Sequence, residues 1–294
     1  QVWDPFVLAG DAKREAARRV EGFLAHSPAE AHQGFEVGSS VAISDEEDKR
    51  RLANGGNINS SNRESSSSVV FVMDIKYVEA HHLFMVLRSD LTIAFFSADT
   101  YVRLGLLKTP SQQYVLEHCP VTDLSFSSGC DGTILSFAIE AHHDADQQMV
   151  KVTTKSIGVL RRHTDIVQEI LAVNCSEVDG GQRLVSCGLD RAIYVWDIAK
   201  GEFVQSKHGN RATIRSIAFD PSSNLLLGAG IEDEVLVWDM WSQLGSPLFR
   251  MEGHRAPVLS VACATGKGRA VSLDESGRII LWDTRKNAAV DSNQ

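Results

Sequence analysis

The sequence lacks both a hydrophobic run long enough to cross a membrane and the cysteine pairs of a disulfide framework or zinc site. Its longest apolar stretches, such as 69–73 and 225–227, fall far short of the roughly 18 residues that a membrane helix needs. The cysteines are five in number, with no C-x-x-C pair, which is typical of free thiols in a reducing compartment. We therefore expect an intracellular protein, with the cytoplasm favoured over the nucleus and the cilium.

Basic residues are also scarce relative to acidic ones. The chain has 29 Lys and Arg against 38 Asp and Glu, which gives a formal net charge of −9. Broad binding to nucleic acid or to an anionic membrane needs concentrated basic charge, so the composition disfavours both. A length of 294 residues with 43% hydrophobic content is enough to bury a sizeable core.

What the sequence does contain is an internal repeat, visible through two independent marks. An apolar run ends in Trp-Asp at three places, 42 and 44 residues apart: Trp196-Asp197, Trp238-Asp239 and Trp282-Asp283. Four histidines, each near a short apolar segment, follow each other at intervals of 45, 45 and 46 residues: His118, His163, His208 and His254. A period of this length indicates a repeat architecture.

The unit between two marks predicts four short strands separated by turns. In one repeat the strands are expected at 213–219, 225–228, 235–238 and 247–251, with turn-forming residues at 220–223 and 232–233. Such a unit is one four-stranded blade.

The three Trp-Asp pairs together with Gly253-His254 resemble the WD-repeat family, whose blades of about 40 to 45 residues match this period. The resemblance implies an all-β fold, a WD-repeat β-propeller. We expect five complete four-stranded blades within 69–290, at approximately 69–114, 115–160, 161–205, 206–251 and 252–290.

The first 68 residues differ from the repeats. Val2-Trp3-Asp4 is itself a Trp-Asp mark without preceding strands, so we expect 1–8 to be the end of a blade in an N-terminally truncated fragment. Residues 9–68 carry a charged run and a serine tract without apolar periodicity, which predicts a largely disordered insert.

The second blade offers two alignments. The segment 131–137 resembles 190–196, but only ten residues separate Val121 from Asp131, which is too few for two strands and a turn. We therefore place 146–152 in the position of the third strand. This choice also leaves His118 in register with the other histidines.

A catalytic interpretation of Ser186, His163 and Asp190 as nucleophile, base and orienting acid has to be weighed against a structural one. The WD-repeat resemblance implies buried networks of His, Ser, Asp and Trp that rigidify each blade. We expect two such networks: His163, Ser186, Asp190 and Trp196, and His254, Ser272, Asp274 and Trp282. The blade between them departs from this His, Ser, Asp and Trp pattern, since it has Gly228 at the Ser position and Glu232 at the Asp position.

The resemblance also implies a rim where the loop before the first strand of each blade lies near the turn between its second and third strands. The side chains expected there are of mixed charge: Thr164, Asp165, Arg191, Arg211, Asp233, Arg255 and Glu275. Such a ring suits a charged peptide or protein partner.

A further segment, 279–286, looks like the box by which some WD-repeat proteins dock on the adaptor of cullin-type ubiquitin ligases. Trp282, Asp283 and Arg285 occupy the matching positions, while the usual Asp of the box falls at Ser276.

The sequence thus predicts a non-enzymatic scaffold or adaptor that binds proteins or peptides in a multiprotein complex through its rim loops. We expect no cofactor, no metal, no small-molecule substrate and no membrane insertion. Two alternatives stay open: a substrate receptor of a cullin-type ubiquitin ligase, and a non-catalytic part of a larger enzyme.

Overall fold

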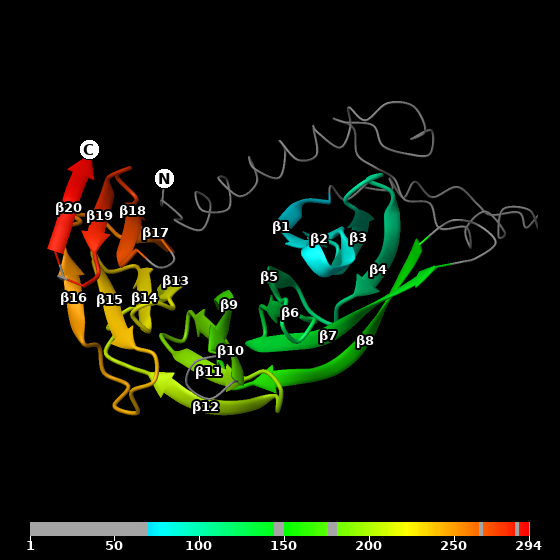
Figure 1. Cartoon of the computed structure of the whole chain (residues 1–294), viewed down its shortest axis with the longest axis horizontal. Helices are drawn as coiled ribbons and strands as arrows, with labels where there is room; N and C mark the ends of the chain where they lie inside the picture. The colour runs from blue at the N-terminus through cyan, green and yellow to red at the C-terminus, as the bar shows by residue number, and fades with distance from the viewer. Residues whose placement is uncertain (1–69, 144–149, 176–180, 265–266, 286–287, 294) are drawn as a thin grey trace, which may run out of the picture. The chain divides into compact units, whose positions relative to one another are not determined.

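The computed structural model describes residues 70–143, 150–175, 181–264, 267–285 and 288–293. These residues form five four-stranded sheets, each made of four strands that are consecutive in the chain, as Figure 1 shows. Neighbouring strands are antiparallel. The fold is a β-propeller, so the predicted fold class is confirmed, and we number these sheets blades 1 to 5.

The strand bounds are as follows. Blade 1 contains β1 (Val72–Val78), β2 (Leu83–Arg88), β3 (Thr92–Ser97) and β4 (Arg103–Lys108), with a 3-10 turn, η1 (Glu79–His81). Blade 2 contains β5 (Gln113–Cys119), β6 (Leu124–Gly129), β7 (Thr133–His143) and β8 (Val150–Arg161). Blade 3 contains β9 (Val167–Cys175), β10 (Gly181–Gly188), β11 (Ile193–Asp197) and β12 (Glu202–Lys207). Blade 4 contains β13 (Ile214–Asp220), β14 (Leu225–Gly230), β15 (Glu234–Asp239) and β16 (Phe249–Glu252). Blade 5 contains β17 (Val258–Ala264), β18 (Arg269–Asp274), β19 (Ile279–Asp283) and β20 (Ala288–Asn293).

Apolar cores fill the spaces between successive blades. Side chains alternate between the two faces of a strand, and in β15 both sets are buried: Leu236 and Trp238 pack toward blade 3, whereas Val235 and Val237 pack toward blade 5. Two further clusters join blade 1 to blade 2 and blade 2 to blade 3. Burial on both faces explains the nearly continuous apolar runs of these strands, and each such side chain contributes about 1.5–3 kcal/mol.

The free face of blade 5 is different. Its alternate residues Leu273, Ile279, Leu281 and Val290 are 36–50% exposed, while Trp282, one residue along from Leu281, is buried against blade 4. No other sheet of the described residues covers this face.

Blade 2 corrects the predicted alignment. Its third strand is β7, and the segment 146–152 therefore does not occupy the third-strand position. Two strands fit before Thr133 because β5 begins at Gln113, upstream of His118. His118 thus lies within a strand, where it bonds Ser125 through Nδ1 at 3.1 Å, and its agreement with the histidine spacing is a coincidence.

No helix among the described residues is long and apolar enough to cross a membrane. The chain segments 1–8 and 9–68, including Trp3-Asp4, lie outside the described residues.

Candidate functional site

In blades 2 to 5, two connections of the blade meet at one rim, and a backbone hydrogen bond joins them. In blade 3, the amide of Leu189, after the second strand, donates to the carbonyl of Ile166, before the first strand, at 2.9 Å. Equivalent bonds recur in blades 2, 4 and 5: Cys130 to Gln112 at 2.8 Å, Ile231 to Thr213 at 3.2 Å and Glu275 to Pro257 at 2.9 Å. The rim loops are therefore fixed to the blades by a repeated contact.

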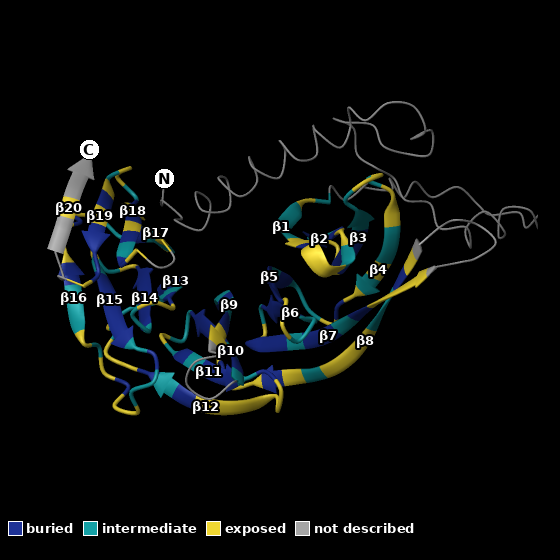
Figure 2. Ribbon diagram, in the orientation of Figure 1, coloured by how far each residue is buried: buried dark blue, intermediate teal, exposed yellow. Residues whose placement is uncertain are grey.

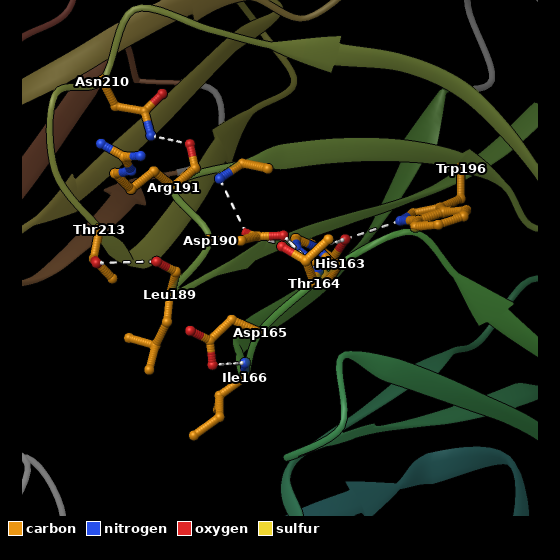
Figure 3. A network of polar contacts seen from close by, with 12 residues as sticks. His163, Thr164, Asp165, Ile166, Leu189, Asp190, Arg191, Trp196, Asn210 and Thr213 are labelled. Atoms are coloured by element: carbon orange, nitrogen blue, oxygen red, sulfur yellow. Dashed lines mark hydrogen bonds and ion pairs between the residues drawn. The ribbon is translucent and has the colours of Figure 1, made fainter.

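Further bonds connect the rim from one blade to the next. The side-chain amide of Asn210, in the loop entering blade 4, donates to the carbonyl of Arg191 in the turn of blade 3, as Figure 3 shows. In the next junction, the amide of Val258 in blade 5 donates to the carbonyl of Glu232 in blade 4 at 3.2 Å. The rim loops of blades 3, 4 and 5 thus form one continuous surface.

Beneath the rim of blade 3, the structure brings together His163, Ser186, Asp190 and Trp196. The indole Nε1 of Trp196 donates to the hydroxyl of Ser186 at 2.9 Å, and that oxygen lies 2.8 Å from Nε2 of His163. Nδ1 of His163 lies 2.9 Å from the carboxylate of Asp190 (Figure 3). Since the carboxylate can only accept, the ring donates to it from Nδ1. With its N–H placed there, the ring accepts at Nε2 from the hydroxyl, which in turn accepts from the indole.

Blade 5 repeats this arrangement. Trp282 donates to the hydroxyl of Ser272 at 2.7 Å, which lies 2.5 Å from Nε2 of His254. Nδ1 of His254 lies 2.8 Å from Asp274, whose side chain is fully buried. Each polar group of this four-residue network, from the indole to the carboxylate, has a hydrogen-bond partner. A buried polar network rigidifies a fold under this condition.

The carboxylates of both networks are held in their charged form. Burial alone would raise the pKa of Asp190, but hydrogen bonds from His163 and from the amides of Thr164 and Ala192 hold it below the ordinary value. Likewise, hydrogen bonds from Ser276, His254 and Arg278 outweigh burial and lower the pKa of Asp274.

Blade 4 lacks such a network. Gly228 offers no hydroxyl, and the ring of Trp238 packs so closely over it that an added Cβ would lie 2.9 Å from the ring. The indole donates instead to the backbone carbonyl of His208 at 2.8 Å, and the imidazole of His208 bonds Ser206. Glu232 accepts a hydrogen bond from the amide of Arg211 at 2.9 Å.

These contacts bear on the catalytic alternative. The hydroxyl of Ser186 is fully buried and is engaged by both the indole and the imidazole. A nucleophile and its base must reach a substrate within hydrogen-bond distance. The arrangement resembles a catalytic triad in residue types, but its geometry serves the packing of a blade.

The rim side chains lie as follows. Six are exposed: Thr164, Asp165, Arg191, Arg211, Asp233 and Arg255. The seventh, Glu275, is half-buried and lies 3.5 Å from Nη1 of Arg215.

Arg215 lies beneath this surface, where it contacts Glu275, and was not predicted from the sequence. It lies in β13 with only 8% of its side chain exposed. Most positions of β13 are buried on both faces of the strand. Its sequence pattern therefore does not show that position 215 lies next to the rim. The neighbouring turn of blade 5 supplies a partner for this charge through Glu275.

Arg285 lies apart from the rim. Its side chain is 64% exposed, and its Nε lies 3.6 Å from the carboxylate of Asp283, which is itself almost fully buried. Trp282 belongs to the buried network of blade 5. Of the three residues of the docking segment, only the arginine presents a side chain to the surroundings.

Two segments of the chain match the model of a known family of repeats. Residues 154–197 and 201–239 match the family model for the "WD domain, G-beta repeat". Each match begins in or just before the last strand of one blade and ends at the third strand of the next. The repeat in the sequence is therefore offset by one strand from the blade in space.

Several WD-repeat proteins are similar over part of their length. Cilia- and flagella-associated protein 337 B of Tetrahymena thermophila is 25% identical over 46% of this chain and 10% of its own length. The small ribosomal subunit protein RACK1 of Drosophila melanogaster is 25% identical over 41% of this chain and 36% of its own length. The WD repeat and SOCS box-containing protein 1 of Takifugu rubripes is 35% identical over 28% of this chain and 18% of its own length. The matched segments thus span about a third or less of these relatives. Together with the five four-stranded blades, the repeat matches show a WD-repeat β-propeller in which 154–197 and 201–239 are WD repeats.

Proposed function

We propose that the chain is a non-enzymatic scaffold or adaptor that binds a protein partner through the rim of blades 3 to 5. The observation that carries the proposal is the continuous rim, in which exposed charged side chains stand on backbone that is fixed by repeated hydrogen bonds. A binding surface held in its bound form loses little conformational entropy when a partner docks. The names of the relatives, which include a ribosomal subunit protein, are consistent with a role in assemblies.

Charge decides which partner the rim favours. The exposed Arg191, Arg211 and Arg255 have no carboxylate partner among the described residues, whereas Glu232 and Glu275 are engaged within the rim. The remaining acidic side chains, Asp165 and Asp233, are exposed. The rim therefore offers three separated guanidinium groups, which suit carboxylates of a protein or peptide.

The test is quantitative affinity capture from lysate with the whole chain and with the triple variant Arg191→Glu, Arg211→Glu and Arg255→Glu. We expect the variant to lose the specific partners while its thermal unfolding stays unchanged, since all three side chains are exposed. A matched control reverses three exposed basic residues outside the rim, Arg103, Lys151 and Lys267, and should keep the partners. Equal loss in both variants would point to net charge, and full retention in the rim variant would refute the proposal.

A second candidate is a substrate receptor of a cullin-type ubiquitin ligase. It is favoured by the exposed guanidinium of Arg285 next to Trp282-Asp283 and by similarity to a protein whose name includes a SOCS box. Recovery of a ligase adaptor that disappears on Arg285→Ala, but persists on Arg103→Ala, would support this function. If no ligase adaptor is recovered, or if its recovery does not change on Arg285→Ala, the receptor function is refuted and the scaffold function remains as the proposal.

A further inference from the structure

One position on the last strand of a blade lies beside the next blade. Among the described residues, this position is covered at three of the four junctions between successive blades and uncovered at the other. In blades 1, 2 and 3, the last strand carries a β-bulge beside the Trp position of the third strand. The last-strand residue paired just before the bulge is Gly105 in blade 1, Gly158 in blade 2 and Gln205 in blade 3. Blade 4 has no bulge in its last strand, and Phe249 takes the equivalent position.

At the junction of blades 1 and 2, this position is covered by the next blade. The hairpin of β7 and β8 is much longer than the others, and it carries Ile139 and Val152 into the core of blade 1, where both are 4% exposed. The backbone carbonyl of Val152 lies so close to Gly105 that no side chain would fit there. An extended segment with an aliphatic residue therefore occupies the site over Gly105.

The junction of blades 3 and 4 is closed in another way. The nine-residue connection 240–248 between β15 and β16 reaches back to blade 3. Gln205 donates through Nε2 to the carbonyl of Met240 at 2.6 Å, and Lys207 donates to the carbonyls of Asp239 and Ser242 at 2.8 Å each. At the junction of blades 4 and 5, the ring of Phe249 itself packs on the core.

Among the residues that the structure describes, none covers the junction of blades 2 and 3 in this way. The connection between β11 and β12 is a tight turn of four residues, 198–201, and it does not extend over β8. A groove of about 240 Å³ remains between this turn and the last strand of blade 2. Its walls include Ile157, Gly158 and Val159 on one side and Trp196 and Lys200 on the other.

The strand that borders the groove carries exposed aliphatic and basic side chains. Ile157 is 51% and Val159 is 39% exposed, and Figure 2 shows how much of β8 is uncovered. Lys155 and Arg161 lie at exposed positions on either side of them, and β8 contains no acidic residue. Asp197, the carboxylate of the groove wall, is already bound by Arg183 at 3.0 Å and by the amide of Lys200.

From these observations we infer that the groove between β8 and residues 198–201 is a second protein-binding site, separate from the rim. It takes an extended segment of a partner protein that places a β-branched aliphatic side chain over Gly158 and carboxylates near Lys155 and Lys200. The junction of blades 1 and 2 supplies the precedent, since Val152 of an extended strand lies over Gly105 with its backbone carbonyl and its Cβ and belongs to the core there. Opposite charge around an apolar anchor fixes the register of such a segment.

Gly158 provides a direct test because its position can be filled without disturbing the strand. A Cβ there would meet only the hydroxyl of Ser136, at an ordinary contact distance of 3.5 Å. Gly158→Val therefore blocks the groove with the side chain that we expect the partner to supply. Its melting temperature should equal or exceed that of the original chain, since valine favours strands.

The probe is a fluorescein-labelled, end-blocked pentapeptide, Glu-Val-Glu-Val-Glu, whose anisotropy is measured with the full chain at low salt. Two comparison peptides, Glu-Gly-Glu-Gly-Glu and Lys-Val-Lys-Val-Lys, lack the aliphatic anchor and the acidic charge respectively. We expect both of them, and the first peptide with Gly158→Val, to bind at least about tenfold more weakly. Lys200→Glu should weaken the first peptide about two- to fivefold, in keeping with an exposed charge pair.

The control is Lys108→Glu, which changes the net charge equally at an exposed position on the last strand of blade 1 and should leave binding unchanged. The rim triple variant should also bind the peptide normally, so that failure of the rim proposal and failure of this one are distinguishable. No saturable binding to the original chain, or equal binding to Gly158→Val, would overturn the inference. A groove occupied by the chain's own residues 1–69 would give the first of these results.

Discussion

Blades 3 and 5 differ from blade 4 in how each secures its third-strand tryptophan, although all three have the same four-stranded topology. In blades 3 and 5, the indole ends a buried chain of hydrogen bonds that runs through serine and histidine to an aspartate beneath the rim. In blade 4, the indole bonds the backbone of His208, and its ring fills the space over Gly228. The fold therefore requires a packed tryptophan at this position, while the network is one of two ways to satisfy its N–H.

The two solutions also support the rim differently. Asp190 binds the amides of Thr164 and Ala192 on both sides of the rim of blade 3. In blade 4, Glu232 binds the amide of Arg211, and its other oxygen lies 3.7 Å from Nη1 of Arg250. We therefore expect the rim of blade 4 to tolerate change better than those of its neighbours.

The largest effect should come from removing the carboxylate of blade 5. Asp274→Ala leaves the fully buried His254 and the backbone of the turn without their acceptor, which should cost about 3–5 kcal/mol of unfolding free energy. The matched change Glu232→Ala in blade 4 removes a half-buried side chain and should cost about 0.5–1.5 kcal/mol. Urea denaturation of both variants measures the contrast, and equal losses would show that the networks do not distinguish the blades.

A serine introduced into blade 4 should destabilise it rather than restore a network. Gly228→Ser places a Cβ 2.9 Å from the ring of Trp238, so the ring must move, at a cost of about 1–3 kcal/mol for overpacking. Thermal unfolding checks this expectation, and Gly158→Ser, where the space is open, is the control. A Gly228→Ser variant more stable than the original chain would mean that blade 4 can adopt the network of its neighbours.

Acid should loosen blades 3 and 5 before blade 4. The pKa values of Asp190 and Asp274 are lowered in the folded chain, so both contribute stability above their ordinary value of 3.8 that is lost as the pH falls through the folded pKa. Protonation keeps the aspartate side chain in place. The loss of unfolding free energy should therefore be smaller than for Asp274→Ala or Gly228→Ser. Hydrogen exchange at pH 5 and at pH 3 measures it through the amides of the rim turns. Asp274→Asn should abolish the change in blade 5 alone, and a change confined to blade 4 would contradict the assignment.

The smallest effect is expected for Glu232→Asp. The shorter side chain supplies the family's usual acid but meets no serine, because position 228 is glycine. We expect a change within about 0.5 kcal/mol, as for a surface substitution. A stabilisation well beyond that, measured by urea denaturation, would show that the aspartate alone carries the strength of the network.

The predicted fold class was confirmed, but the strand alignment of blade 2, which has no Trp-Asp mark, was wrong. Blade 2 has Phe137 at the Trp position, and its long hairpin breaks the spacing on which the alignment depended. The proximity of His163, Ser186 and Asp190 could be expected because their positions in the repeat are marked. Arg215 and the groove at Gly158 could not, since both depend on what the next blade places opposite them.

The most direct test of the central claim, that the rim binds the partner, is hydrogen exchange of the chain alone and in complex with a partner recovered by capture. The account predicts new protection at 164–166, 189–192, 209–213, 231–233, 253–257 and 275–278, the segments that form the rim of blades 3 to 5. Protection confined to β8 and residues 198–201, or to the free face of blade 5, with no change at the rim, would contradict it.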